Sequence, residues 1–419
     1  MPSTAFPALA VVRPELAPSR HEVLRRDNNR QHRRWLVRRG PLLGSTRRKP
    51  VSAVRDVGEP GLQPPASGEL GDESGEEAFA AWLGSELAAS RAARAYPELM
   101  SMSEAGVGGA ILRWRRRFRG DATTWKRLWK ADRVLKEVDE VAPVLDRALR
   151  WVAERPPGSP RVTLLDLCSG KGYLGMLLAE LCPPDSVERI VLVDQAWPLS
   201  GAPDVGPHHI NWDHIYGRYF HSWPVTLVTS KQNIKKRRTL AAMADVLLAR
   251  AEGPVALLAV HLCGTLSLRA VDLFNTNPAD IGLLVLKPCC LPRPQPRQLF
   301  TIGLHTFPGA EVRGVGRFVP HSEAASRWRG PPRWQLAPRF NRWADHLVAG
   351  IEPGQGGRKG MLRLQTAASG GYQDAYLVAE RPRLFGLGAE DAPTLCEATP
   401  VEATALTPQA TEDSKPQDS

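Results

Sequence analysis

The sequence lacks any run of about eighteen consecutive apolar residues, the length that a membrane-spanning helix needs, so it predicts no membrane span. Cysteine is also scarce, with six in 419 residues. Five of the six fall within the predicted core, and four of these lie at or just beyond predicted strand ends: Cys168, Cys263, Cys289 and Cys290. This distribution is unlike a secreted disulfide framework, so we expect reduced thiols in an intracellular protein.

Acidic residues are sparse near the N-terminus. Residues 20–49 carry eleven Arg and Lys against two acids. Such a segment is typical of an organelle transit peptide, and a disordered basic tail is the alternative. The compartment therefore stays open between a chloroplast or mitochondrion and the cytoplasm or nucleus. The net charge of +11 favours an anionic partner.

Composition divides the chain into four regions. Gly (36 residues) and Pro (37 residues) are abundant and crowd toward the ends, which predicts poorly ordered flanks around one catalytic domain. The regions are a disordered basic extension (1–75), a helical N-terminal region (76–155), a catalytic domain (156–385) and a disordered acidic tail (386–419).

The helical region has two segments with apolar residues at helical spacing. We expect one helix over Glu76–Ala95 and a longer basic helical stretch from Ile111 to Val152. Within the second segment, Arg113–Lys130 alternates cations with tryptophans, a composition that can bind phosphates and stack on unpaired bases. This stretch is our candidate RNA contact. The alternatives are packing of the tryptophans against the catalytic domain and a solvated face for the arginines. The sequence does not reveal the oligomeric state.

Strands and helices alternate regularly after residue 156. Predicted strands lie near 162–167, 189–194, 225–229, 255–260 and 281–287, and predicted helices span 171–182, 235–252, 265–274 and Pro338–Ala349. An irregular insertion is expected at 293–333, and Gly360–Ala367 with Ala375–Arg381 reads as a closing hairpin. The alternation predicts an α/β, doubly wound, parallel sheet with helices on both faces.

The most informative segment runs from Val162 to Gly175, VTLLDLCSGKGYLG. It predicts a buried strand that enters a glycine-rich turn and then a helix. Backbone N–H groups at the helix start, together with glycines that lack Cβ, allow a ligand to approach closely. A second apolar strand ends in Asp194 about twenty residues later, a spacing that suits an acid accepting hydrogen bonds from a ribose diol.

An acid followed by small residues at every second position, Asp166, Cys168, Gly170 and Gly172, resembles the first motif of class I S-adenosylmethionine (SAM) methyltransferases. The resemblance implies a Rossmann-like, mostly parallel seven-stranded sheet that ends in an antiparallel hairpin. It implies SAM as the cofactor, with the loop around its methionine part and Asp194 on its ribose. The alternative is an ordinary strand, turn and helix with no ligand.

The same resemblance implies roles for single residues. The implied cofactor-binding set is Asp166, Cys168, Ser169, Gly170, Lys171, Gly172, Asp194, Asn233 and His261. Asp166 is expected to orient the loop and Lys171 to fix it, while Cys168 replaces the usual first glycine. The loop after the third strand often supplies an acid for the adenine amino group, and the amide oxygen of Asn233 can accept that bond. Alternatives are a turn-stabilising Asp166, a helix-capping Asp194 and a solvated Asn233.

Three segments narrow the resemblance: DLCSGKGYLG, HLCGTLSLRAVDL and KPCC. Together they look like the methyltransferase family that includes the acceptor-stem tRNA 2′-O-methyltransferase and methyltransferase-like proteins, over about residues 130–290 and the closing hairpin. That tRNA enzyme carries Cys/His zinc-binding segments before its catalytic domain. No cysteine precedes Cys168 here, so we expect that module to be absent. The implied function is SAM-dependent methylation of RNA, with tRNA among the candidates. Methylation of protein or a small molecule, and a non-catalytic module that binds RNA or a partner, are the alternatives.

Substrate-side candidates follow the fourth and fifth predicted strands, because ligands bind beyond the carboxyl ends of parallel strands. They are His261, Lys287, Cys289 and Cys290. His261 can remove a proton from an acceptor hydroxyl, or it simply hydrogen-bonds the strand end. The two adjacent cysteines are a nucleophile or redox pair, or they pack under a loop. Zinc on His261 and the thiols, with Cys263, is chemically reasonable, but adjacent cysteines rarely both reach one ion, so we assign no metal.

One further polar and aromatic cluster, His208-His209-x-x-Trp212-Asp213-His214, follows the second predicted strand. Its histidines and its acid offer metal ligands. We favour a loop over the cofactor instead.

Overall fold

The computed structural model describes residues 73–199, 209–217, 222–320, 326–366 and 372–382. The expected transit peptide or basic tail and the acidic tail from residue 386 lie outside these residues. Apart from Ser326, every described residue belongs to one compact unit. Within the described ranges, no helix is both long enough and apolar enough to cross a membrane.

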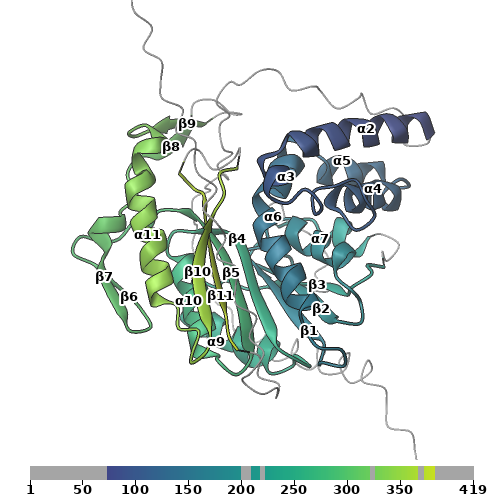
Figure 1. Cartoon of the computed structure of the whole chain (residues 1–419). Coiled ribbons are helices and arrows are strands. Elements are labelled where there is room, and N and C mark those ends of the chain that lie inside the picture. Colours follow the sequence, from purple (N-terminus) through teal and green to yellow (C-terminus); the bar gives the residue numbers. More distant parts are fainter. Residues whose placement is uncertain (1–72, 200–208, 218–221, 321–325, 367–371, 383–419) are drawn as a thin grey trace, which may run out of the picture. The chain divides into compact units, whose positions relative to one another are not determined.

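A seven-stranded sheet with the order β10-β11-β5-β4-β1-β2-β3 forms the centre of this unit (Figure 1). Its strands are β1 (Val162–Leu167), β2 (Val187–Asp194), β3 (Leu227–Lys231), β4 (Val255–Cys263), β5 (Ile281–Cys290), β10 (Arg358–Arg363) and β11 (Ala375–Glu380). Strands β1 to β5 run parallel to one another, whereas β11 is antiparallel to both β5 and β10. The expected mostly parallel, doubly wound, Rossmann-like sheet with a closing antiparallel hairpin is confirmed.

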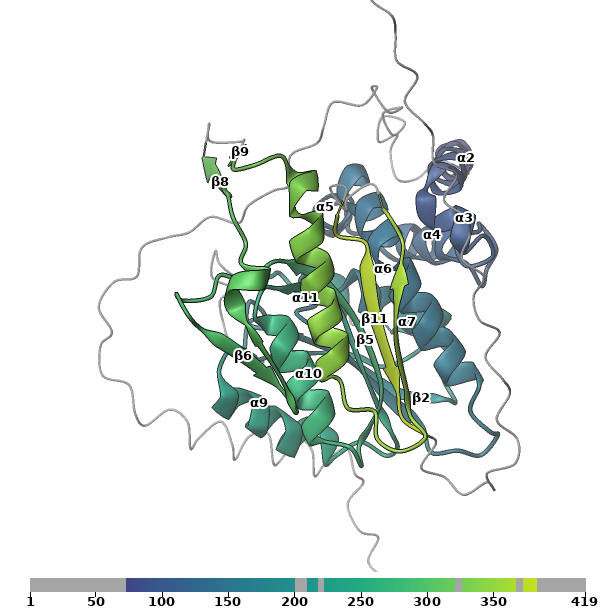
Figure 2. The same cartoon turned by 60° about the vertical axis from the view of Figure 1, so that its left-hand side comes forward.

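Helices cover both faces of the sheet, and Figure 2 shows α10 and α11 on the opposite side from α6 and α7. The bounds are α6 (Ala131–Ala153), α7 (Tyr173–Leu181), α9 (Arg237–Met243), α10 (Leu266–Thr276) and α11 (Ala337–Gly350). Successive strand residues alternate between two cores: Leu164 packs with α6 and α7, and Leu165 packs with α10 and α11. Burial on both faces explains why β1 is a continuous apolar run with every residue buried.

Among the described residues, four helices precede α6: α2 (Glu73–Ala89), α3 (Arg91–Ala95), α4 (Val107–Arg117) and α5 (Ala122–Leu128). They share a core with α6, α7 and one face of the sheet, to which Trp114 contributes a fully buried ring. The expected helical region is thus present as separate shorter helices. The boundary predicted at residue 155 stays a prediction.

The largest differences between the structure and the expected elements lie in three places. The segment 293–333, expected to be irregular, contains a hairpin of β6 (Leu299–Ile302) and β7 (His305–Pro308). It also contains the 3-10 turn η2 (Gly309–Val312) and the short strands β8 (Arg317–Pro320) and β9 (Ser326–Arg329). A second 3-10 turn, η3 (Arg333–Leu336), begins at its last residue. Helix α9 passes into the π-helical turn η1 (Ala244–Leu248) and ends before the predicted residue 252. Strands β4 and β5 run three residues further than predicted, so His261, Cys263 and both adjacent cysteines lie within strands.

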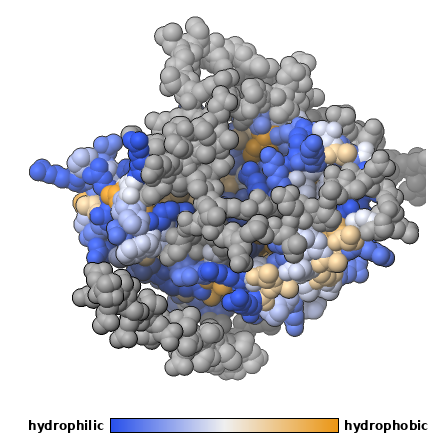
Figure 3. All heavy atoms as spheres, turned by 90° about the horizontal axis from the view of Figure 1, so that it is seen from above, coloured by the Kyte–Doolittle hydropathy of each residue, from blue (hydrophilic) through white to orange (hydrophobic). Residues whose placement is uncertain are grey.

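Hydrophilic side chains cover much of the described surface in the view from above, with apolar side chains in small separate groups (Figure 3). On the helical region, Arg116 of α4, Lys126 of α5 and Arg119 between these helices are exposed. The structure thus keeps a basic surface on the helical region.

Candidate cofactor-binding site

The turn between β1 and α7, residues 168–172, is named here the cofactor loop. Cys168, Gly170 and Gly172 have φ values of 57°, 55° and 85°. A left-handed conformation costs a non-glycine residue about 1–2 kcal/mol, so Cys168 occupies a position that backbone geometry favours for glycine. Gly172 caps the start of α7, and a Cβ there would lie 2.6 Å from Leu192 Cδ1. The loop geometry therefore agrees with a motif of small residues at alternate positions.

Asp194 ends β2 with its carboxylate against the cofactor loop. Its Oδ2 accepts the Gly170 N–H at 3.2 Å, and its Oδ1 accepts the Ala196 N–H at 2.8 Å. A Cβ added to Gly170 would meet nothing within 4 Å, so there is open space beside the loop at this residue. The half-buried carboxylate fastens the loop to the strand, and its remaining lone pairs can accept further hydrogen bonds.

Asp166 lies in β1 beneath the loop and is buried. Burial is the main reason that its pKa is raised from 3.8 to about 8, and a backbone hydrogen bond from Gly175 partly opposes this shift. Its Oδ2 has no hydrogen-bond partner among the described residues. Buried polar atoms are nearly always paired, so this oxygen fits a site for a ligand's N–H group or a bridging water.

Neighbouring segments hold the cofactor loop from outside. Lys171 Nζ donates to the Arg127 carbonyl at 2.6 Å, and Tyr173 Oη donates to the Leu128 carbonyl at 2.8 Å. Burial lowers the pKa of Lys171 to about 8, and nearby cations add to the shift. The Lys171 side chain therefore ties the loop to α5, in line with the fixing role expected for it.

His214, in the short helix α8 (Asp213–Tyr216), lies against the same loop. Burial lowers its pKa to about 4, so its ring is neutral at physiological pH. The Nε2 atom lies 2.7 Å from the Lys171 carbonyl, which can only accept, so Nε2 carries the proton. The expected segment over the cofactor loop is therefore in contact with it at His214, while His208 lies outside the described residues.

Ser169 and Asn233, both predicted to contact the cofactor, are already hydrogen-bonded. Ser169 Oγ accepts the Trp197 Nε1–H at 3.2 Å. Asn233 follows β3, and its Oδ1 accepts the Lys235 N–H at 3.1 Å, a local turn contact. That bond uses one lone pair of the amide oxygen suggested for the adenine amino group, and the second lone pair can still accept a hydrogen bond.

His261 and Lys287 belong to a charge cluster at the ends of β4 and β5. His261 Nε2 lies 2.8 Å from Glu137 Oε2 and 3.4 Å from Glu140 Oε2, while Lys287 Nζ lies 3.3 Å from Glu140 Oε1. Burial disfavours the imidazolium, but the hydrogen bond and charge of Glu137 outweigh it and raise the pKa of His261. Burial lowers the pKa of Lys287 although Glu140 opposes this. The cluster places a proton-holding imidazole between two carboxylates.

Glu137 and Glu140 were not among the residues predicted from the sequence. Both lie in α6, which packs along β4 and β5. Glu140 is 5% exposed and lies between Val138 and Val141, which are also buried. A carboxylate on the buried face of an amphipathic helix is rare unless it is paired, and this pattern could have marked the position.

The cysteines of β4 and β5 form a second cluster. Cys263 Sγ lies 3.1 Å from Cys289 Sγ, which lies 3.7 Å from Cys290 Sγ. Hydrogen bonds from the other two thiols lower the pKa of Cys263, and the Cys289 pKa is correspondingly raised. His261 lies with the two glutamates, so the four-ligand set considered from the sequence divides into two separate groups.

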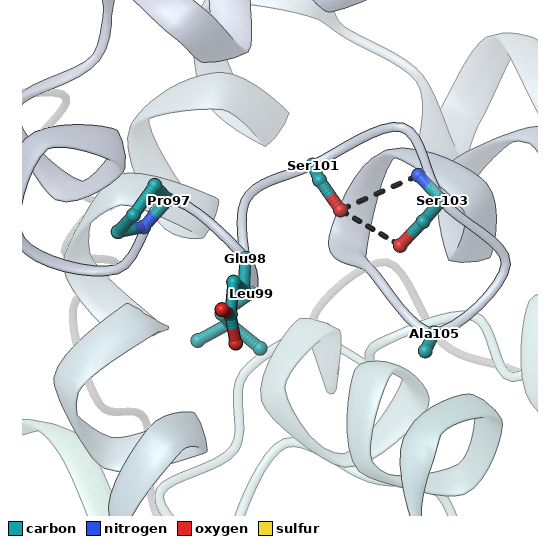
Figure 4. Close-up of a pocket in the computed structure, with 6 residues that line it drawn as sticks. All are labelled: Pro97, Glu98, Leu99, Ser101, Ser103 and Ala105. Atoms are coloured by element: carbon teal, nitrogen blue, oxygen red, sulfur yellow. Dashed lines mark hydrogen bonds between the residues drawn. The ribbon is translucent and has the colours of Figure 1, made fainter.

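One shallow pocket of about 640 Å³ lies in the segment between α3 and α4 (Figure 4). Its lining residues are Pro97, Glu98, Leu99, Ser101, Ser103 and Ala105. Ser101 Oγ contacts both Ser103 Oγ and the Ser103 N–H. None of the predicted cofactor or substrate residues lines this pocket, so we assign it no part in the chemistry.

No known family model matches the sequence, and no curated protein matches it. Among solved structures, the chain is similar to a cyclopropane-fatty-acyl-phospholipid synthase-like protein from Lactobacillus casei ATCC 334, with 19% identity, 38% of this chain covered and a TM-score of 0.21. It spans about half of that protein, 52%. It is also similar to an O-methyltransferase family protein from Burkholderia thailandensis, with 12% identity, 68% of this chain and 76% of that chain covered, and a TM-score of 0.21.

Proposed function

We propose that the chain is a SAM-dependent methyltransferase. The observation that carries this proposal is the Asp194 carboxylate at the end of β2, bonded to Gly170 beside open space. In doubly wound sheets, an acid at this place accepts hydrogen bonds from ribose hydroxyls, while the first strand–helix turn lies against the rest of the ligand. The glycine-rich loop and the unpaired Asp166 oxygen fit the methionine part of SAM.

Bound SAM would supply an activated methyl group for in-line displacement. The residues of this chain then have to bind the cofactor, orient the acceptor and accept a proton from an acceptor hydroxyl or amine. Asp194 and the cofactor loop serve the first task. His261, held by Glu137 at the end of β4, serves the last, because an imidazole with a raised pKa is a stronger base once it has lost its proton.

RNA, with tRNA among the candidates, is the acceptor that we propose. Arg127, Lys130 and Arg133 lie close enough to Lys171 that their charges lower its pKa, so cations gather beside the cofactor loop. Such a group suits a polyanion, because phosphate contacts supply most of the sequence-independent affinity for nucleic acid. The chain's net charge of +11 supports the same acceptor class.

The tryptophans of the Arg113–Lys130 stretch serve the fold. Trp114 is fully buried. Trp125 and Trp129 stack on each other with ring centroids 5.2 Å apart and also contact Phe79. Trp125 and Trp129 thus pack on α2 of the helical region, whereas the alternative raised from the sequence was packing against the catalytic domain, and the proposed RNA contact rests on the cations.

Transfer of labelled methyl groups from SAM to separated RNA, protein and small-molecule fractions tests the proposal. We expect label in RNA with the wild-type chain and its loss with Asp194→Ala. The matched control is Asp185→Ala, which removes an exposed acid that precedes β2, at the opposite edge of the sheet. Label only in protein or in small molecules would overturn the RNA acceptor. If the chain binds SAM but no fraction becomes labelled, the chain is a non-catalytic module.

A further inference from the structure

We propose that Cys263, Cys289 and Cys290 form a three-thiolate site for zinc, with the fourth coordination position open to an exogenous ligand. The three sulfurs lie within 4.8 Å of one another. Neither this site nor its test depends on methyl transfer.

The local backbone explains how two adjacent cysteines reach one point. In a regular strand, successive side chains point to opposite faces, which would separate Cys289 from Cys290. Along the β4–β5 ladder Leu262 pairs with Pro288, and Cys263 pairs with Cys290, so the register skips Cys289. An extra residue of this kind is a β-bulge, which re-aims a side chain, and bulges are frequent beside functional sites. Here it leaves the two adjacent sulfurs only 3.7 Å apart.

The sulfur separations suit a tetrahedral ion. Zn–S bonds are about 2.3 Å long, so two thiolates on one tetrahedral zinc lie about 3.8 Å apart. The observed separations of 3.1 and 3.7 Å, with the third below 4.8 Å, are close to this value, and small side-chain rotations would equalise them. Adjacent cysteines rarely share one ion, but the bulge brings these two sulfurs close enough to do so.

The donor set selects the metal class. Three soft thiolates favour zinc or another thiophilic ion over magnesium or calcium, which prefer oxygen ligands. Cys263 is exposed, which gives an ion a path of entry. The carbonyl of Cys289 accepts from Gln373 Nε2, and that of Cys290 accepts the Gly264 N–H at 3.2 Å, so the ligand backbone is held.

The open position follows from counting ligands among the described residues, where three thiols gather without a fourth donor. Three protein ligands with one open position is the pattern of zinc sites that bind a water or a substrate group, whereas structural sites have four protein ligands. The site lies at the carboxyl ends of β4 and β5, the edge at which ligands of doubly wound sheets bind.

Zinc titration of the reduced full-length chain tests the site, with zinc content measured after dialysis and cobalt(II) absorption as the second readout. We expect one ion per chain and an intense thiolate-to-cobalt charge-transfer band. Each of Cys263→Ser, Cys289→Ser and Cys290→Ser should weaken zinc binding by at least about 100-fold, because loss of a second-shell partner alone costs 10–100-fold. The matched control Cys182→Ser changes a buried cysteine at the end of α7 and should leave binding unchanged.

Circular dichroism and thiol counts accompany the titration. Zinc-free wild-type protein with all thiols reduced and native ellipticity would overturn the site. Equal zinc affinity in the wild type and in the three variants would overturn it as well. If a Cys263–Cys289 disulfide forms in air, and the protein binds no zinc after this disulfide has been reduced, the two cysteines are a redox pair and not zinc ligands.

Discussion

The backbone N–H of Gly170 donates to the Asp194 carboxylate at 3.2 Å, so the last residue of β2 holds the turn that follows β1. The two residues are 24 positions apart in the chain and meet because β1 and β2 are parallel neighbours. We propose that the same carboxylate accepts hydrogen bonds from the ribose hydroxyls of SAM. Its contact with the loop means that ribose binding and loop geometry are coupled through one side chain.

Cys168 provides a test of the loop geometry. At the φ of 57° found at this position, a residue with a side chain is strained by about 1–2 kcal/mol, whereas glycine is not. Cys168→Gly and Cys168→Ala both remove the thiol, so we expect the glycine variant to be more stable by about 1 kcal/mol, the reverse of the order in a helix. Denaturant unfolding of the two variants measures this difference. A more stable alanine variant would show that the residue does not adopt the left-handed conformation in solution.

The pair Lys287–Glu140 is buried on both sides, with side chains 2% and 6% exposed. Removing one partner of such a pair leaves an uncompensated charge and costs about 3–5 kcal/mol. Lys287→Met should therefore lower the free energy of unfolding by about that amount, and adding Glu140→Gln should recover part of it. The control Arg150→Ala removes a more exposed i,i+4 pair with Asp146 and should cost less than about 0.5 kcal/mol. Equal losses in the free energy of unfolding for Lys287→Met and Arg150→Ala would contradict the interpretation of Lys287–Glu140 as a buried pair.

His214 predicts a dependence of stability on pH. Its folded pKa of about 4 lies below the usual 6.5, so between these values the unfolded chain binds more protons than the folded one. Stability therefore falls as the pH drops from about 6.5 to 4, by about 3 kcal/mol at most from this residue. His214→Gln keeps a donor for the Lys171 carbonyl and should flatten that part of the curve. An unchanged slope in the variant, measured by urea unfolding across this pH range, would contradict the buried neutral ring.

Lys130 and Arg133 are the cations through which we expect RNA to bind beside the cofactor loop. Each phosphate contact on a single strand contributes about 0.7 to the slope of log affinity against log salt. The double variant Lys130→Ser/Arg133→Ser should reduce that slope by about 1.4 in filter-binding assays. The control Arg161→Ser/Arg250→Ser removes two exposed arginines that precede β1 and β4, at the opposite edge of the sheet, and should not change the slope. Equal losses in both double variants would indicate a response to net charge alone.

Much of the fold could be predicted because the parallel strands are buried on both faces. The apolar run of β1 has the predicted bounds, 162–167, and the glycines mark its turn. The hairpin at Leu299–Pro308 escaped prediction because its alternation spans only four residues in each strand, among prolines and arginines that suggest a loop.

The contact between Asp194 and the loop after β1 was predictable from the sequence, and the surroundings of His261 only in part. Asp194 and Gly170 lie at neighbouring strand ends, a relationship that the strand order dictates. The partners of His261 come from α6, more than a hundred residues earlier in the chain, and no local spacing connects Glu137 to His261. The grouping of Cys289 with Cys290 depends on a β-bulge, which the sequence pattern does not reveal.

Calorimetric titration of the purified chain with SAM tests the central claim most directly. The wild type and Asp185→Ala should bind SAM with equal affinity. Asp194→Ala should bind at least about tenfold more weakly, since a hydrogen bond to a charged group contributes about 1.5–3 kcal/mol. Absence of binding to the wild type, or equal affinity in Asp194→Ala, would contradict the proposal that this carboxylate holds the cofactor.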